Sequence, residues 1–328
     1  MLTDARKADH LRIAAGAGVV GAVPTGLDEV RLRHRALPER DLDAVRLDCT
    51  LLGRPLDAPL LISAMTGGTP AARAVNAALL AAAAEHGVAM ALGSGRALLD
   101  DPSLLPTYGG SAFARPPLLL ANLGADALDG AARLVDLLDA DGLSIHLNPL
   151  QEAIQPEGSP AFAGIAERIA RAVAELAPLP VVAKEVGFGL GGEDVAELAA
   201  AGVAAVDVAG AGGTNWALVE GRRDARASEV AGAFAGWGVP TARALADAHA
   251  AAPSLPLIAS GGVGDGVEAA KCLALGASAV GVARPLLRAA QEGVAADAVA
   301  LLLRQLRIAT WLAGAPSAAA LGPEHLAR

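Results

Sequence analysis

The stretch LIASGGVGDGVEAAKCLALGASAVGVARP, residues 257–285, contains one complete unit of the fold. It begins with a short apolar strand, passes through a glycine-rich turn into an alanine-rich helix, and ends in a second apolar strand. Strands that are apolar throughout are typical of parallel sheets with both faces covered. The stretch therefore predicts a strand, a covering helix and a parallel strand in succession.

The same alternation extends through the chain from Pro59 onward. Eight strands are predicted, at 59–64, 88–92, 118–122, 142–146, 181–185, 205–209, 257–260 and 279–283. Helices with apolar residues at helical spacing are predicted at 71–85, 127–138, 162–176, 194–200, 241–251 and 267–275. Eight strand–helix units favour an α/β protein with a closed TIM (β/α)8 barrel over an open sheet. Residues 59–328 would form the barrel, and residues 1–58 an N-terminal extension that lays a basic arm over its catalytic face.

The composition narrows the classes of function. The chain has 328 residues, of which 53% are hydrophobic and only 2% aromatic, and its net charge is −9. No nucleic-acid partner is expected, because such a surface needs clustered Lys and Arg. No run approaches the roughly 20 strongly apolar residues of a membrane span, and the first ten residues lack the apolar segment of a secretory signal. We expect a cytoplasmic protein without a membrane partner.

Polar and glycine-rich residues follow nearly every predicted strand. Because all strands of such a barrel end on one face, these residues should meet at one mouth, where barrel active sites are built. The glycines after strands seven and eight can offer backbone N–H groups to a phosphate. Glycines alone could simply permit tight turns, and their occurrence after both strands favours a phosphorylated ligand. Residues 211–238 form a long irregular connection, which predicts a lid or a disordered segment.

Lys184 ends the fifth predicted strand. A buried ammonium is costly there unless an anion or a reaction requires it. It could form a Schiff base, as in an aldolase, or lie beside an electron-rich ring, or pair with a carboxylate such as Glu185. The residue by itself leaves these three interpretations open.

Four polar residues follow the fourth predicted strand closely: His146, Asn148, Gln151 and Glu152. Residues two apart on a strand point to the same side, so His146 and Asn148 can both face the mouth. The imidazole can bind a phosphate oxygen, the amides can orient a substrate, and Glu152 can bind Mg²⁺ directly or through water. Each residue type alone is more often structural, but the clustering favours function.

Further cations come from two other parts of the chain. Arg6, Lys7 and His10 lie near the N-terminus, where charged residues are usually only solvated. Arg96 directly follows the second predicted strand, and a guanidinium in that position suits an anionic ligand.

Together these segments resemble the type 2 isopentenyl-diphosphate isomerases, an FMN-dependent barrel family related to the FMN hydroxy-acid-oxidising enzymes. The resemblance runs nearly end to end and depends on the order of its motifs along the strand ends. The motifs are Arg6-Lys7 with His10, Ala64-Met-Thr-Gly-Gly68, Gly93-Ser94, Ala121-Asn-Leu-Gly-Ala125, His146-Leu-Asn148 with Gln151-Glu152, Pro180-Val-Val-Ala-Lys-Glu-Val-Gly-Phe-Gly189, Gly212-Gly-Thr-Asn215 and Ser260-Gly-Gly262.

The resemblance implies a role for each matching residue. By it, Met65, Thr66, Ser94, Asn122, Lys184 and Thr214 contact the flavin, and Gly261, Gly262, Ala283 and Arg284 lie near its phosphate. Likewise, Arg6, Lys7, His10, Arg96, His146 and Asn148 bind the substrate diphosphate, Glu152 binds its Mg²⁺, and Gln151 lies beside the alkene. Gln151, Lys184 and His146 are then the residues at the reacting centre.

The resemblance also implies the chemistry. Isopentenyl diphosphate would be isomerised to dimethylallyl diphosphate, in isoprenoid biosynthesis, with reduced FMN as acid and base. Lys184 would stabilise negative charge on the reduced ring, and NADPH or NADH would only reduce the flavin. Such relatives form tetramers or octamers, so a homo-oligomer is expected.

Two departures leave alternatives open. The family usually has a glutamine where Gly95 stands and an arginine near Gly264, so the resemblance does not fix the side-chain contacts to the substrate and the flavin phosphate at these positions. One alternative is an FMN hydroxy-acid oxidoreductase, but such enzymes need a histidine base and arginines around the seventh strand, where this chain has glycines. The others are a Schiff-base aldolase, which leaves the glycine-rich segments unexplained, and a non-catalytic flavin-binding barrel.

Overall fold

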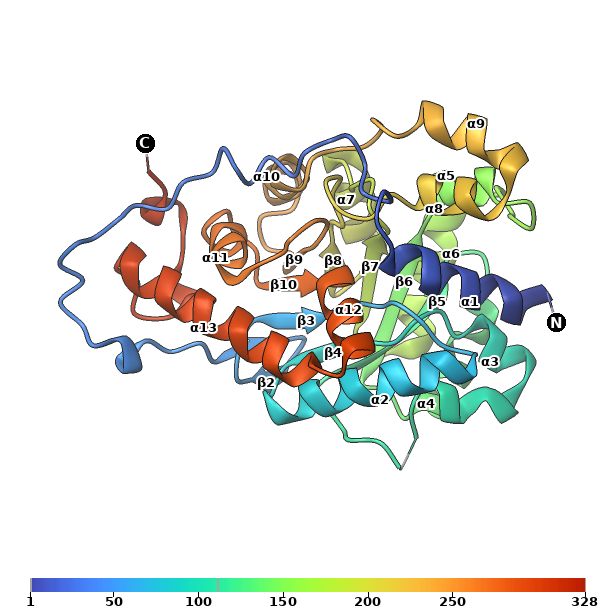
Figure 1. The fold of residues 1–328 in the computed structure, drawn as a ribbon, viewed down its shortest axis with the longest axis horizontal. Coiled ribbons are helices and arrows are strands. Elements are labelled where there is room, and N and C mark those ends of the chain that lie inside the picture. The colour runs from blue at the N-terminus through green and yellow to red at the C-terminus, as the bar shows by residue number, and fades with distance from the viewer. Residues whose placement is uncertain (1, 111, 328) are drawn as a thin grey trace.

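A closed barrel of parallel strands forms the centre of the molecule (Figure 1). The computed structural model describes residues 2–110 and 112–327. The barrel strands are β3 (Leu60–Ile62), β4 (Ala89–Ala91), β5 (Leu119–Gly124), β6 (Gly142–Leu147), β7 (Val181–Glu185), β8 (Ala205–Asp207), β9 (Leu257–Ala259) and β10 (Ala279–Val282). Each pairs with the next in chain order, and β10 pairs with β3. The predicted TIM barrel is confirmed, and each of the eight predicted strands corresponds to one of these strands.

Helices cover the outside of the barrel. They are α2 (Pro70–Glu85), α4 (Ala131–Leu138), α6 (Ile165–Leu176), α7 (Gly192–Ala200), α10 (Thr241–Ala251), α11 (Gly266–Ala274), α12 (Arg284–Glu292) and α13 (Ala295–Ala313). The shorter helices α3 (Arg96–Asp100) and α5 (Pro149–Ile154) follow β4 and β6 and contribute residues to the mouth of the barrel. Short 3-10 turns occur at Leu42–Ala44, Pro102–Thr107, Leu128–Gly130, Ala318–Ala320 and Pro323–His325. Among the described residues, no helix is long and apolar enough to cross a membrane.

Small and branched side chains fill the interior of the barrel. Leu61, Val182 and Ile258 belong to one buried cluster of residues from strands around the barrel. The same cluster includes Leu51 and Leu56, which lie on an antiparallel hairpin of β1 (Cys49–Leu51) and β2 (Arg54–Leu56). The hairpin therefore packs against the residues that fill the barrel interior.

The N-terminal extension packs on the barrel. It starts with α1 (Leu2–Ala15), which lies at the end of the barrel toward which the strand arrows point (Figure 1). Beyond α1, isolated bridges join Val20 to Thr214 and Leu32 to Leu326. The first barrel strand begins at Leu60, close to the expected boundary. The division into two domains stays a prediction, because the extension contacts the barrel along its course.

The prediction of an irregular connection at 211–238 is wrong. The segment contains α8 (Trp216–Arg223) and α9 (Ala225–Ala233). Asn215 accepts a hydrogen bond from the first turn of α8, and Asp224 does the same for α9, as helix N-caps do. Gly221 lets the two helices pack closely, since a Cβ there would lie 2.7 Å from the Cβ of Ala231. Both helices are short and contain glycine and several charged residues. These residues interrupt the apolar spacing from which a helix is predicted in a sequence.

Candidate active site

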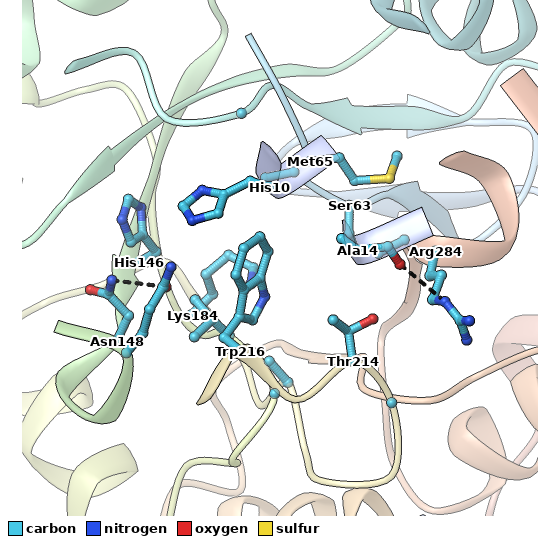
Figure 2. Close-up of a pocket in the computed structure, with 18 of the residues that line it drawn as sticks. His10, Ala14, Ser63, Met65, His146, Asn148, Lys184, Thr214, Trp216 and Arg284 are labelled. Atoms are coloured by element: carbon cyan, nitrogen blue, oxygen red, sulfur yellow. Dashed lines mark hydrogen bonds between the residues drawn. The ribbon is translucent and has the colours of Figure 1, made fainter. Parts of the chain in front are cut away.

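One cavity of about 460 Å³ opens at the carboxyl ends of the strands. Residues that follow the strands line it on one side, and residues of α1 on the other (Figure 2). Every residue that the sequence associated with a cofactor, a substrate diphosphate or a metal ion lines this cavity. The structure therefore brings together groups from residue 6 to residue 284, as the common polarity of the strands predicts.

The floor of the cavity is formed by polar side chains inside the barrel. Lys184 on β7 pairs in register with Asp207 on β8, so both side chains point inward. Lys184 Nζ donates to the backbone oxygen of Glu185 (2.5 Å), and within the described residues it forms no ion pair. Asp207 Oδ1 accepts from Ser260 Oγ (2.5 Å). Burial raises the pKa of Asp207, and the nearby Lys184 charge opposes this effect.

Glu185 does not form the ion pair with Lys184 that one interpretation of the sequence required. Its side chain leaves the barrel on the other side of the strand, where Oε2 accepts from the backbone N–H groups of Gly187 (2.6 Å), Phe188 (2.5 Å) and Gly189 (3.1 Å). Burial raises the pKa of Glu185 to about 7, and these N–H groups only partly offset that effect. The carboxylate thus holds the loop after β7, which lines the cavity.

Among the buried polar atoms that have no hydrogen-bond partner within the described residues, two belong to cavity-lining residues at the strand ends. They are Ser63 Oγ after β3 and Asn122 Nδ2 on β5. Buried polar groups are nearly always hydrogen-bonded, so these atoms indicate a ligand with polar edges. Beside them, a Cβ at Gly281 would lie 2.6 Å from Ser63 Oγ. The floor is therefore kept open by glycine, and a flat group such as a flavin ring fits it.

A corner suited to a phosphate lies beyond β9 and β10. Gly261 and Gly262 have positive φ angles of 101° and 77°, which glycine adopts readily. The N-terminus of α11 is already occupied by the side chain of Asp265. Helix α12, by contrast, begins after Ala283 without a side-chain cap. Backbone N–H groups in the first turn of α12 can therefore donate to an anion, and the binding of a phosphate at this corner stays a prediction.

Arg284 points away from this corner. Its Nε donates to Ala14 O near the end of α1 (3.1 Å, Figure 2). Its Nη2 donates to Gly16 O, just beyond the helix (2.6 Å). Only its backbone remains next to the phosphate corner. The expected contact between Arg284 and a phosphate thus concerns the main chain, and it stays a prediction.

Helix α1 forms the opposite wall of the cavity. Lys7 Nζ donates to Ser94 O (2.9 Å) and to the hydroxyl of Tyr108 (2.5 Å). His10 Nε2 lies 2.8 Å from Glu220 Oε1, and its ring meets the Trp216 ring edge to face at 5.3 Å between centroids (Figure 2). These contacts place the Lys7 and His10 side chains at the cavity.

A third wall is formed by groups after β4, β5 and β6. His146 Nδ1 lies 2.8 Å from Asn122 Oδ1, and Arg96 forms an ion pair with Asp126. Burial, and then the positive charge of Lys184, lower the pKa of His146 to about 4. His146 is therefore neutral at pH 7 in this structure. Because the Asn122 oxygen can only accept, the ring proton lies on Nδ1.

A hydrogen-bond chain runs from the end of β6 to α8. Asn148 Nδ2 donates to Gln151 Oε1 (3.1 Å) and Glu152 Oε1 (2.9 Å), and Gln151 Nε2 donates to Glu220 Oε1 (2.7 Å). Burial alone would raise the pKa of Glu220, but hydrogen bonds from His10, Gln151 and Arg223 bring it below its usual value. Glu220 is thus a buried carboxylate that fixes both His10 and Gln151.

Known proteins resemble this chain along its whole length. A family model described as FMN-dependent dehydrogenase matches residues 154–328. An isopentenyl-diphosphate delta-isomerase from Xanthobacter autotrophicus is 50% identical, covering 96% of this chain and 95% of its own. Proteins of the same name from Nostoc sp. (44% identical, covering 95% and 92%) and Methanothermobacter thermautotrophicus (42%, covering 96% and 90%) also match. The chain belongs to the isopentenyl-diphosphate delta-isomerase family.

Solved structures outside the isopentenyl-diphosphate delta-isomerases share the fold at lower identity. A mandelate oxidase with (S)-2-phenylpropionate has a TM-score of 0.64 at 23% identity, and the match covers 99% of this chain and 96% of that one. A double mutant of flavocytochrome b2 with sulfite bound has a TM-score of 0.69 at 18% identity, covering 97% and 82%. At these identities the likeness extends to the barrel alone.

Four residues of the site were not predicted from the sequence: Asp126 and Trp216 line the cavity, and Tyr108 and Glu220 contact residues that line it. Asp126 pairs with Arg96, Tyr108 with Lys7, and Trp216 and Glu220 with His10. Trp216 and Glu220 are four residues apart, the spacing of one helix face, which was the available signal in a segment interpreted as irregular. Tyr108 is the chain's single tyrosine, but nothing in its local sequence indicates a site.

The binding of a metal ion by Glu152 stays a prediction. Its Oε1 and Oε2 accept hydrogen bonds from Asn148 Nδ2 and from Ser159 N (2.8 Å). In the described part of the chain, no group of three or more His, Cys, Asp or Glu side chains is arranged to hold a metal ion. A cation beside Glu152 would therefore need most of its ligands from water and from a bound substrate, which is the usual mode for Mg²⁺.

Proposed function

We propose that this protein interconverts isopentenyl diphosphate and dimethylallyl diphosphate, with FMN, Mg²⁺ and a substrate diphosphate held in the one cavity at the barrel mouth. The observation that carries the proposal is the convergence on that cavity of every residue to which the resemblance assigns a contact with flavin, diphosphate or Mg²⁺. Identities of 42–50% to relatives with this name, over almost the full length of both chains, support it.

The floor and the phosphate corner are proposed to hold FMN. Ser63 Oγ and Asn122 Nδ2 would gain the partners that they lack, and Met65, Thr66, Ser94 and Thr214 would surround the ring. The free N-terminus of α12 and the glycines at 261 and 262 would bind the phosphate. In its reduced form, FMN would supply the acid and the base for moving the double bond. The Lys184 ammonium would balance negative charge on the ring, and NADPH or NADH would reduce it.

The α1 wall and the third wall are proposed to hold the diphosphate. Arg6, Lys7, His10, Arg96, His146 and Asn148 line the space between them. Arg96 and Lys7 are paired with protein groups here, and these pairs would exchange for phosphate oxygens, which bind a guanidinium or ammonium strongly. Although the protein has a net charge of −9, cationic side chains gather at this cavity, where the diphosphate would bind them.

Gln151 is proposed to orient the alkene. Its amide cannot supply a proton at pH 7, but its direction is set by the bond from Nε2 to Glu220 and by Asn148. The neighbouring Glu152 would take Mg²⁺ together with the diphosphate. The protein's contribution is then orientation and charge, which is the usual division of work in a cofactor enzyme.

The competing functions fit the cavity less well. A hydroxy-acid oxidoreductase needs a histidine base after the seventh strand, yet the cavity histidines are His10 on α1 and His146 on β6. A Schiff-base aldolase would use Lys184 but leaves the unpartnered Ser63 and the open glycine floor without a purpose. The experiment must therefore distinguish an isomerase from a flavin-binding barrel without turnover.

The test follows isopentenyl diphosphate in D₂O after anaerobic reduction of the FMN-loaded protein. Deuterium incorporation only after reduction supports isomerisation, and FMN binding without incorporation supports a non-catalytic barrel. Lys184→Ala should weaken FMN retention, while Lys271→Ala, on the barrel exterior, should not. Glu152→Gln should raise the Mg²⁺ requirement without releasing flavin. Wild-type turnover in both site variants would refute the site assignment.

We also propose a cytoplasmic homo-oligomer, a tetramer or an octamer. Trp237 is 61% exposed and Val230 is 53% exposed, and the Trp237 ring packs edge to face on Phe234. An exposed aromatic surface of this kind supports a contact with another copy of the chain. Light scattering of the purified protein tests the proposal, and a monomeric mass at micromolar concentration would contradict it.

A further inference from the structure

Helix α1 is fastened by its C-terminal end. Arg284, on the first turn of α12, donates to Ala14 O (3.1 Å) and Gly16 O (2.6 Å). One turn later on the same helix, Arg288 Nε donates to Ala15 O (2.8 Å). Three successive carbonyls at the end of α1 are therefore bound by two arginines from one helix.

A third arginine completes the contact from α8. Arg222 Nη1 donates to Ala17 O (2.5 Å), the next carbonyl along the chain. Gly18 follows with a φ of 72°, and a Cβ there would lie 2.3 Å from the Arg222 guanidinium. The backbone after α1 is thus shaped to let Arg222 approach. We refer to Arg222, Arg284 and Arg288 as the arginine clasp.

The clasp has a clear electrostatic basis. The last carbonyls of a helix lack internal partners and lie at its negative end, where cations are favourable. Arg284 and Arg288 are four residues apart, and like charges at that spacing repel. Burial and the Arg288 charge both lower the pKa of Arg284. Two such cations are stable side by side here because they share the carbonyl end of α1.

The clasp also holds the part of α1 that faces the cavity. Lys7 and His10 lie on the same helix, which ends at Ala15, and their contacts include Ser94, Tyr108 and Glu220. A bound diphosphate would compete for these same side chains. The clasp uses backbone carbonyls instead, so it can hold α1 whether or not a ligand is bound.

We infer that the arginine clasp positions α1 for diphosphate binding and links α1 to the cofactor corner, because the backbone of Arg284 lies beside that corner while its side chain holds the helix. The three arginines are positioning residues, which act through Lys7 and His10. The inference depends on the proposed function for its kinetic readout, and two further readouts are independent of turnover.

The kinetic test uses Arg222→Ala, Arg288→Ala and the double variant, which leave Arg284 in place. The KM for isopentenyl diphosphate should rise about tenfold in the double variant, while kcat stays within about twofold, the pattern of lost substrate binding. FMN affinity should not change. Compared with Arg288→Ala, Arg288→Lys should restore most of the wild-type KM, since the lysine ammonium keeps a positive charge at the carbonyl end of α1. Arg243→Ala, an exposed arginine paired with Asp247, is the matched control.

The independent tests use hydrogen exchange of the α1 amides and calorimetric binding of inorganic pyrophosphate to the FMN-loaded protein. The double variant should exchange faster in α1 and bind pyrophosphate more weakly, and the control should do neither. Unchanged α1 exchange would overturn the clasp, and faster exchange with unchanged pyrophosphate affinity would overturn its role in ligand binding. If the wild type binds pyrophosphate but does not isomerise the substrate, the proposed function fails while these results still decide the clasp.

Discussion

Binding of a diphosphate should place a proton on His146. In this structure the ring is neutral, because burial and then the charge of Lys184 lower its pKa to about 4. Asp126 opposes this shift, and Arg96 and Lys7 add to it. Since Nδ1 donates to Asn122, the neutral ring presents an unprotonated Nε2. A lone pair repels a phosphate oxygen, so His146 can donate to the ligand only after it gains a proton.

The magnitude follows from the pKa and from Coulomb's law. Adding a proton at pH 7 to a group with a pKa of about 4 costs about 4 kcal/mol. One negative charge about 4 Å away contributes about 4 kcal/mol at the effective dielectric constant of roughly 20 found near protein surfaces. A phosphate oxygen in contact would therefore bring the pKa to about 7, and about half a proton should be taken up per ligand at pH 7.

Calorimetry measures this uptake directly. Inorganic pyrophosphate is titrated into the FMN-loaded protein at pH 7 in buffers of different ionisation enthalpy. The slope of the observed binding enthalpy against the buffer ionisation enthalpy gives the number of protons taken up. His146→Gln should reduce the slope by about half a proton, whereas His34→Gln, at an exposed position, should leave it unchanged. Equal slopes in the wild type and His146→Gln would refute the reasoning, whatever protons the ligand itself exchanges.

Three other predictions follow from single contacts. Gly281→Ala should weaken FMN binding by at least about tenfold, because the new Cβ overpacks the floor of the cavity. The control is Gly232→Ala, where a Cβ meets nothing within 4 Å. Equal FMN affinity of Gly281→Ala and wild type in a flavin-fluorescence titration would contradict the prediction. Burial raises the pKa of Glu185 from 4.5 to about 7, so the folded protein holds a proton that the unfolded chain releases, and the wild-type free energy of unfolding should fall as the pH rises through that window. Glu185→Gln should flatten this dependence in urea titrations, and an unchanged slope would argue against it. Tyr108→Phe removes a hydroxyl that bonds Ser94 O (2.8 Å) and Lys7, so the free energy of unfolding should drop by about 1–2 kcal/mol, and wild-type stability in urea would disprove the claim.

The barrel and its polarity could be predicted because they depend on local patterns. Apolar strands, helical spacing and glycine-rich strand ends repeat within short windows, and parallel strands place all their carboxyl ends on one face. These patterns alone predict Lys184 and His146 at the same mouth, and both line the cavity. Helices α8 and α9 escaped prediction because glycine and charges interrupt their apolar faces.

The sequence by itself determined which residues meet at the mouth, since strand order and direction follow from periodicity and turn chemistry. Only the tertiary structure decided what each side chain does there. Glu220 joins His10 to Gln151, and Arg284 turns from the phosphate corner to the end of α1. These contacts connect residues that are far apart in the chain, and their geometry depends on how helices pack around the barrel. No pattern within a short window of sequence contains that information, because side-chain direction is set by neighbours from other elements.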